Sequence, residues 1–140
     1  MAARLEHANL TVPDIDAAID FLRTVEPGFR VLHDAGESGA YRWVHIGTGD
    51  TYFALEAPHG AVDDARAARR YTDWGINHLG LVVDDIAAAA ARLEAKGYRE
   101  GHVPEFHSAR IRRYFYDSAG FEWELVQYLT DRHEDRFSYS

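Results

Sequence analysis

An internal repeat constrains the fold of this chain more than any other feature of its sequence. Residues 5–22 (LEHANLTVPDIDAAIDFL) match residues 76–93 (INHLGLVVDDIAAAAARL) at a constant offset of 71. The matched positions include His7 with His78 and Leu22 with Leu93. Such self-similarity indicates that one supersecondary unit occurs twice, so the chain is expected to consist of two like modules.

Each copy has the pattern of a βαβββ unit. Alternating apolar residues predict an opening strand, and Asp14 and Asp85 are the expected N-caps of the helices that follow. Gly28 and Gly97 are expected to end these helices. Three strands should follow in each copy, near 28–34, 40–46 and 51–57, then near 98–103, 109–116 and 121–128. The prediction is an α+β fold in which two tandem modules form a curved mixed sheet around a metal-binding cavity.

The length of 140 residues suits one compact domain. We expect module one at 4–58, a linker helix within 59–75, module two at 76–129 and a polar tail at 130–140. The linker helix is suggested by the alanine- and arginine-rich stretch 61–71 (AVDDARAARRY). The tail is expected either to fray or to pack on a partner subunit.

Composition excludes several classes of function. The chain has no cysteine, so any metal must be held by nitrogen and oxygen ligands. A net charge of −8 disfavours nucleic acid as a partner. No apolar run approaches the roughly 18 residues that span a bilayer, and the first residues lack an apolar signal region. We therefore expect a cytoplasmic protein that does not bind membranes.

The repeat also points to a metal site. His7 and His78 occupy equivalent strands and would face each other if the modules pair about a pseudo-twofold axis. In the last strand, Glu122 and Glu124 share one face. Two imidazoles and a carboxylate suit a divalent first-row metal and leave positions open for substrate. A histidine in a strand is more often a packed or solvent-facing residue, so spacing alone leaves both interpretations open.

Three stretches resemble the vicinal oxygen chelate superfamily, which includes glyoxalase I, extradiol dioxygenases, methylmalonyl-CoA epimerase and the fosfomycin- and bleomycin-resistance proteins. They are residues 5–10 (LEHANL), 76–83 (INHLGLVV) and 115–125 (FYDSAGFEWEL), where Ser118 replaces the usual proline. The resemblance extends over residues 4–129. It implies the metal ligands His7, His78 and Glu124, a divalent ion (Ni, Zn, Co, Mn or Fe(II)), a small-molecule substrate and a homodimer.

The resemblance also implies a fourth ligand, a Glu or Gln in the fourth strand, for which Glu56 is the candidate. Glu124 lies four residues after Gly120, whereas four residues after Asp50 is Ala54. Glu56 shares a face with Ala54 but lies about two residues, roughly 6–7 Å, further along the strand. A β-bulge would restore Glu56 to the ligand position. Direct ligation by Glu56 and a three-ligand site with Ala54 in that position both stay open.

The choice of fourth ligand bears on the reaction. With Glu56 as ligand, the resemblance implies a lyase or isomerase similar to glyoxalase I, in which Glu56 and Glu124 are catalytic and a proton is abstracted next to a metal-bound carbonyl. Three ligands alone suit a ring-cleaving Fe(II) dioxygenase. A bleomycin-resistance-like binding protein without catalysis is a third alternative, although it would not need all three ligand positions.

Strand parity gives the candidate substrate-binding residues. Arg112, Tyr114 and Tyr116 share one face of the strand 109–116, and Trp43 and His45 share one face of the strand 40–46. Arg112 would pair with a carboxylate or phosphate, and the rings would stack on an apolar or aromatic group. The alternative is that these residues only cover sheet surface. Four histidines near predicted loops are expected to be solvated: His33, His59, His102 and His107.

Overall fold

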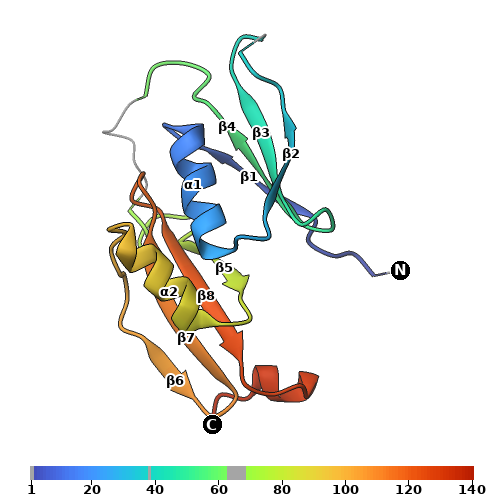
Figure 1. The fold of residues 1–140 in the computed structure, drawn as a ribbon, viewed down its shortest axis with the longest axis vertical. Coiled ribbons are helices and arrows are strands. Elements are labelled where there is room, and N and C mark those ends of the chain that lie inside the picture. Colours follow the sequence, from blue (N-terminus) through green and yellow to red (C-terminus); the bar gives the residue numbers. More distant parts are fainter. Residues whose placement is uncertain (1, 38, 63–68) are drawn as a thin grey trace. The chain divides into compact units, whose positions relative to one another are not determined.

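The repeat is visible in the architecture. The computed structural model describes residues 2–37, 39–62 and 69–140, and the chain divides into two compact units, Met1–Ala67 and Ala68–Ser140. Both units have the element order β, α, β, β, β (Figure 1). The predicted tandem βαβββ modules and the α+β class are therefore confirmed.

The first unit contains one helix and one four-stranded mixed sheet. Its elements are β1 (His7–Thr11), α1 (Ile15–Val25), β2 (Arg30–Asp34), β3 (Trp43–Gly47) and β4 (Tyr52–Glu56). The strands are ordered β1-β4-β3-β2, with β1 parallel to β4 and the other pairs antiparallel. Helix α1 packs on β3 and β4. Its apolar stripe meets the apolar face of the sheet, and the fully buried residues are Phe21, Leu22, Val25, Val44, Ile46 and Leu55.

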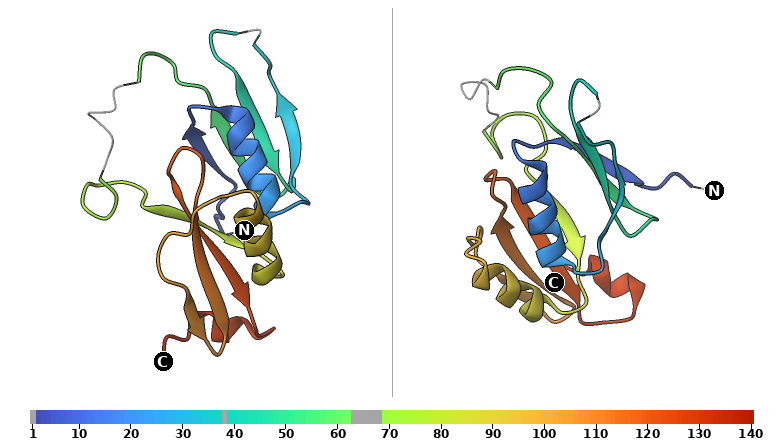
Figure 2. Two further views of the ribbon diagram at one scale, coloured as in Figure 1. Left: turned by 60° about the vertical axis from the view of Figure 1, so that its left-hand side comes forward. Right: turned by 45° about the horizontal axis from the view of Figure 1, so that its top comes forward.

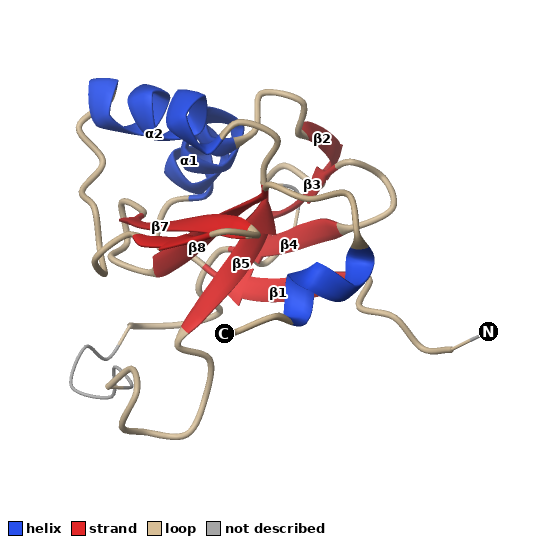
Figure 3. Ribbon diagram, turned by 90° about the horizontal axis from the view of Figure 1, so that it is seen from below, coloured by secondary structure: helices blue, strands red, loops and turns tan. Residues whose placement is uncertain are grey.

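The second unit repeats this arrangement. It contains β5 (His78–Val82), α2 (Ile86–Ala95), β6 (Glu105–His107), β7 (Arg110–Tyr116) and β8 (Glu122–Tyr128), with the strands ordered β5-β8-β7-β6. Helix α2 covers one face of β7 and β8 (Figure 2). Leu93 on the helix and Phe115 and Leu125 on the strands are fully buried there. Figure 3 shows α2 on one side of β7 and β8. Because side chains alternate along a strand, the other residues of these strands project from the opposite side.

The helix ends follow from local chemistry, with one difference from expectation. The side chains of Asp14 and Asp85 accept hydrogen bonds from the third residue beyond, at 3.0 and 2.9 Å, so both predicted N-caps are confirmed. Gly97, with φ +82°, follows the end of α2 as predicted. The role assigned to Gly28 is wrong. Helix α1 ends at Val25, and its C-cap Glu26 is extended because a residue before proline avoids the helical conformation.

The strand predicted at 98–103 is also wrong in its bounds. Residues 99–101 pair with β7 only through an isolated bridge at Glu100, and β6 begins after Pro104 at Glu105. The chain leaves the sheet at His102 because the backbone N–H of His102 turns to the side chain of Glu122, at 3.3 Å. This break in an edge strand places a histidine beside the sheet.

A linker helix was predicted within 59–75 and a polar tail at 130–140. The centre of the predicted linker helix, residues 63–68, lies outside the described residues, and residues 70–73 form turns rather than helix. The tail forms a short 3-10 helix, His133–Phe137, after which the carbonyl of Ser138 accepts a hydrogen bond from Arg110 at 2.6 Å. It therefore packs on its own unit. No helix in the described part of the chain is long and apolar enough to span a membrane.

Candidate functional site

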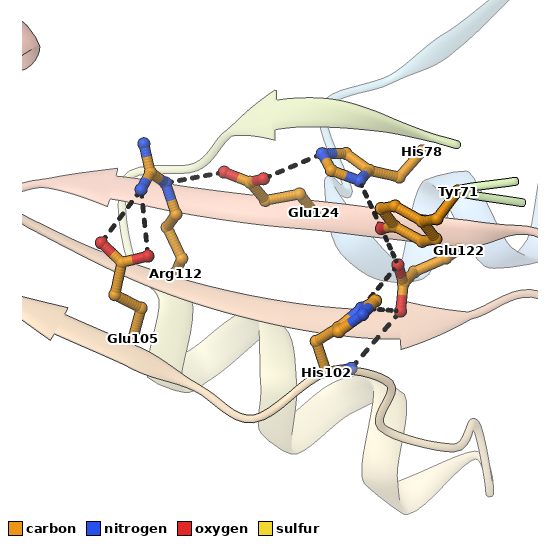
Figure 4. A network of polar contacts seen from close by, with 7 residues as sticks. All are labelled: Tyr71, His78, His102, Glu105, Arg112, Glu122 and Glu124. Atoms are coloured by element: carbon orange, nitrogen blue, oxygen red, sulfur yellow. Dashed lines mark hydrogen bonds and ion pairs between the residues drawn. The ribbon is translucent and has the colours of Figure 1, made fainter. Parts of the chain in front are cut away.

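Two of the expected metal ligands meet in the second unit. In the parallel register of β5 and β8, His78 lies opposite Glu122 and Gly80 lies opposite Glu124. A Cβ atom at Gly80 would meet no atom within 4 Å, so the space above this residue is open. The Nε2 atom of His78 lies 3.1 Å from Oε2 of Glu124 (Figure 4). A nitrogen and an oxygen donor thus face one point on the side of the sheet that α2 does not cover.

The other ring nitrogen of His78 contacts a polar network built around one buried carboxylate, that of Glu122. Its Nδ1 lies 3.0 Å from the hydroxyl of Tyr71, which donates to Oε1 of Glu122 at 2.8 Å (Figure 4). Nδ1 of His102 lies 2.7 Å from Oε2 of the same carboxylate. Glu122 has no solvent-exposed surface, yet each of its oxygens has a donor. This satisfies the requirement that a buried charge be hydrogen-bonded.

The pKa shifts agree with this arrangement. Burial, and then the hydrogen bond to Glu122, raise the pKa of Tyr71 to about 12, so the phenol keeps its proton. Burial alone would raise the pKa of Glu122, but the hydrogen bonds from Tyr71 and His102 outweigh it and hold the pKa below its ordinary value. At neutral pH the network therefore consists of a phenol that donates to a carboxylate anion.

A pocket of about 420 Å³ opens over these groups, with a lining of six residues: Tyr71, His78, His102, Val103, Glu105 and Tyr114. Burial, and then the charge of Glu124, raise the pKa of Tyr114 to about 12, so its hydroxyl also stays protonated. The pocket thus combines imidazoles and phenols above the His78–Glu124 pair.

Arg112 lies next to the pocket but is held by acidic residues. Its Nη1 donates to both oxygens of Glu105, at 3.0 and 3.1 Å, and its Nε lies 2.9 Å from Oε1 of Glu124. Two carboxylates therefore share its charge. Tyr116 lies elsewhere, with Arg70 and Arg99 over its ring at 5.3 and 4.6 Å, and it lines a separate pocket of about 480 Å³.

In the first unit, rings extend across the face that α1 does not cover. His7 stacks on Tyr52, with ring centroids 4.9 Å apart, and Tyr52 contacts His45 at 4.6 Å. Trp43 lies 5.0 Å from His45 and 4.7 Å from His33. Trp43 and His45 thus share a face as parity predicted. His33 is exposed, as expected, and its ring also contacts that of Trp43.

The register of β4 bears directly on Glu56. His7 lies opposite Tyr52, and Ala54 lies two residues further on, where the second unit has Glu124. The pairings of β4 with β1 and β3 are continuous, and the register shift in this sheet lies between β2 and β3. No bulge therefore moves Glu56 back to the position of Ala54. Its carboxylate instead lies 3.3 Å from His59.

Within each unit, the His, Asp and Glu side chains supply only some of the ligands that a divalent ion needs. In neither unit do three or more His, Asp or Glu side chains gather around one point, within residues 2–37, 39–62 and 69–140. The second unit offers the nitrogen and oxygen pair of His78 and Glu124, and the first offers His7 and, two residues off register, Glu56. These atoms are the types that first-row divalent ions accept.

Sequence reasoning missed three residues of the network. Glu122 shares a face with Glu124, which was a usable signal, but nothing local marks it as buried. Tyr71 and His102 carry no pattern, because their partner Glu122 is 51 and 20 residues away in the chain. One clue was Gly101, since a side chain there would collide with the carboxylate of Glu122.

Comparisons with known proteins agree with the fold described above. A 2-epi-5-epi-valiolone epimerase from Actinomyces sp. is 29% identical over 109 residues, covering 68% of this chain and 60% of the relative, so the match spans less than two thirds of that protein. Among solved structures, a glyoxalase family protein from Bacillus cereus superposes with a TM-score of 0.76 at 19% identity, covering 93% of this chain and 97% of that chain.

A third relative shows the same fold with a metal. It is a variant of the fosfomycin resistance protein FosX from Listeria monocytogenes, in complex with Mn(II) and dihydroxypropylphosphonic acid. It has a TM-score of 0.63 at 16% identity and covers 89% of this chain and 90% of that chain. Finally, residues 4–125, most of the chain, match one family profile. The protein therefore belongs to the glyoxalase/bleomycin resistance protein/dioxygenase superfamily.

Proposed function

We propose that this protein is a divalent-metal-dependent enzyme that moves a proton at a carbon next to a carbonyl in a small oxygenated substrate. The observation that carries the proposal is the 3.1 Å approach of His78 Nε2 and Glu124 Oε2 beneath a pocket of about 420 Å³. His7 is the third proposed ligand. The bound ion would act as a Lewis acid that polarises the carbonyl and makes the adjacent C–H more acidic.

The proposed substrate chemistry agrees with that of two relatives. The Actinomyces relative is named as an epimerase, and an epimerase inverts a stereocentre, which can proceed by removal and return of a proton. The FosX variant was crystallised with Mn(II) and a ligand that carries two hydroxyls. Neither fact assigns a substrate to this chain, but both support a metal-dependent reaction on a small oxygenated molecule.

Two groups of this chain are proposed to hold the moving proton. His102 lines the pocket, and its Nδ1 is fixed by Glu122, so its Nε2 is left to accept or donate a proton over the pocket. Glu56 is the proposed carboxylate base of the first unit. The Ala54 register makes it a base beside the ligand position, rather than a ligand, unless β4 rearranges when a metal binds. The reaction consumes no oxidant, because the proton removed from carbon is returned to carbon.

A ring-cleaving dioxygenase is the second candidate, and one observation favours it. Ala54 occupies the position where a fourth carboxylate would bind, which leaves two histidines and one carboxylate as ligands. That set with open positions is typical of Fe(II) enzymes that activate O₂. A binding protein without catalysis is the third candidate, supported only by the acidic net charge of −8.

Metal analysis of protein purified without added metal separates these candidates. Bound Ni, Zn, Co or Mn, together with deuterium uptake next to the carbonyl of polyhydroxylated ketones in D₂O, would support the proton-transfer enzyme. Oxidisable Fe(II) with oxygen uptake on catechols would support the dioxygenase. If the protein binds no divalent metal under reducing conditions, both proposals are lost. Comparing the metal affinities of Glu56→Gln and Glu124→Gln then shows whether Glu56 is a ligand.

A further inference from the structure

We propose that Glu122 and Tyr71 are positioning residues that set which ring nitrogen carries the proton in both histidines of the pocket. Through Tyr71, Glu122 directs the Nε2 lone pair of His78 toward the metal position. Through a direct hydrogen bond, it directs the Nε2 lone pair of His102 into the pocket. The role toward His78 rests on the proposed metal centre, whereas the role toward His102 does not.

The argument for His78 starts from the single proton of Tyr71. That proton is donated to Glu122, because a carboxylate can only accept a hydrogen bond. The phenol oxygen, 3.0 Å from Nδ1 of His78, must then act as the acceptor, so Nδ1 carries the imidazole proton. In the neutral ring this leaves Nε2 with a free lone pair, and Nε2 is the atom that faces Glu124 at 3.1 Å.

A lone pair that faces a carboxylate oxygen at that distance repels it unless a proton or a metal ion lies between the two atoms. A metal ion held by both would remove that repulsion. Histidine ligands commonly donate their second ring N–H to a carboxylate or another acceptor, which fixes the ring and strengthens the ligand. Here a phenol lies between the imidazole and the carboxylate, and the contact runs from His78 through Tyr71 to Glu122.

The argument for His102 follows the same logic with a direct contact. Its Nδ1 lies 2.8 and 2.7 Å from the two oxygens of Glu122, so Nδ1 carries a proton. Its Nε2 has no hydrogen bond within the part of the chain that the structure describes, and His102 lines the same pocket as His78. One buried carboxylate therefore orients both rings.

Two local features beside this network are unusual for a folded chain. Tyr71 has φ 63°, a left-handed conformation that non-glycine residues rarely adopt, and its backbone N–H donates to Asn77 Oδ1 at 2.6 Å. Backbone strain of this kind gathers at functional sites. Gly101 leaves room for the carboxylate of Glu122, which would otherwise meet a Cβ atom. Both features thus serve one buried carboxylate.

The test compares the full-length wild type with Tyr71→Phe, Glu122→Gln and a matched control, Tyr128→Phe, which loses only a hydroxyl on the same strand as Glu122. Zn(II) and Co(II) dissociation constants are measured by titration calorimetry and by the Co(II) absorption bands. Two-bond ¹H–¹⁵N spectra of metal-free protein, at a pH where His102 is neutral, report which of its ring nitrogens is protonated. Thermal unfolding shows that each variant is folded.

We expect Tyr71→Phe to weaken metal binding about 10–100-fold, while Tyr128→Phe binds as the wild type does. In the wild type His102 should be protonated at Nδ1, and in Glu122→Gln the proton should shift toward Nε2. A merely structural role would lower the unfolding temperature without moving that proton. If Glu122→Gln does not fold, Tyr71→Phe still tests the positioning of His78.

Failure of this inference differs from failure of the proposed function. If the wild type binds metal and Tyr71→Phe binds it equally well, the positioning of His78 is overturned and the metal centre stands. If the wild type binds no divalent metal, the proposed function falls, and the role toward His78 falls with it. If His102 is protonated at Nε2 in the wild type, or keeps its Nδ1 proton in Glu122→Gln, the role toward His102 is overturned.

Discussion

Replacing Glu122 by glutamine should destabilise the protein far more than a typical Glu-to-Gln change. The carboxylate accepts from the hydroxyl of Tyr71 at 2.8 Å, from Nδ1 of His102 at 2.7 Å and from the backbone N–H of His102 at 3.3 Å. Glutamine keeps one carbonyl oxygen but points an NH₂ group at a remaining donor. A hydrogen bond to a charged group contributes about 1.5–3 kcal/mol. With at least one bond lost and one donor left opposed, we expect a loss of about 2–4 kcal/mol at pH 7.

The loss of stability in Glu122→Gln should also depend on pH, in a direction that follows from the pKa of Glu122. The pKa of Glu122 is lower in the folded protein than its ordinary value of 4.5. Its contribution to stability is therefore fully present above pH 4.5 and is lost as the pH falls through the lower folded value. The glutamine variant lacks this titration. The difference in unfolding free energy between the wild type and Glu122→Gln should thus narrow in acid.

Urea unfolding followed by tryptophan fluorescence measures both effects. Trp123 adjoins Glu122 in β8 and is 2% exposed, so its emission reports on this region. The control is Glu134→Gln in the tail, where the ion pair with Arg132 is exposed and should matter little. A loss below about 0.5 kcal/mol at pH 7, or a difference that does not change between pH 7 and about pH 3, would refute this reasoning.

Two further predictions follow from other parts of the fold. Asp14 and Asp85 cap equivalent helices in the same way, so Asp14→Ala and Asp85→Ala should each lower the unfolding free energy by about 1 kcal/mol in urea titrations. An unchanged unfolding free energy in either variant would contradict this equivalence. Hydrogen bonds from Arg42, and then from the backbone of Gly36, lower the pKa of Asp34 to about 2. Its contribution to stability is therefore present above its unfolded pKa of 3.8 and is lost as the pH falls toward 2, so the acid-unfolding curve of Asp34→Asn should be flatter than that of the wild type.

The modules and their helix caps were predictable because their signals are local. An aspartate at the start of an apolar stripe and alternating residues in a strand can be recognised without knowing the rest of the fold. The repeat doubled each of these signals. The error at Gly28 also has a local cause. Pro27 keeps the residue before it, Glu26, in an extended conformation, so the helix ends before it reaches Gly28.

The polar network was not predictable because its contacts are tertiary. His102 looked like a loop histidine in solvent, and only the break in the edge strand at that point brings it to Glu122. Tyr71 lies in a turn with no periodic pattern, where it combines a left-handed backbone with a hydrogen bond to Asn77 that the sequence does not announce. Counting residues from the turn did place Ala54, rather than Glu56, at the position equivalent to Glu124, because β4 has a regular register.

Divalent-metal affinity tests the central claim most directly. In Mn(II) or Zn(II) titrations, the wild type should bind one ion, and His78→Gln and Glu124→Gln should each weaken binding by more than about 100-fold. Glu134→Gln should bind as the wild type does. An undiminished affinity in Glu124→Gln, or no binding by the wild type under reducing conditions, would contradict the assignment of His78 and Glu124 as the metal-binding pair.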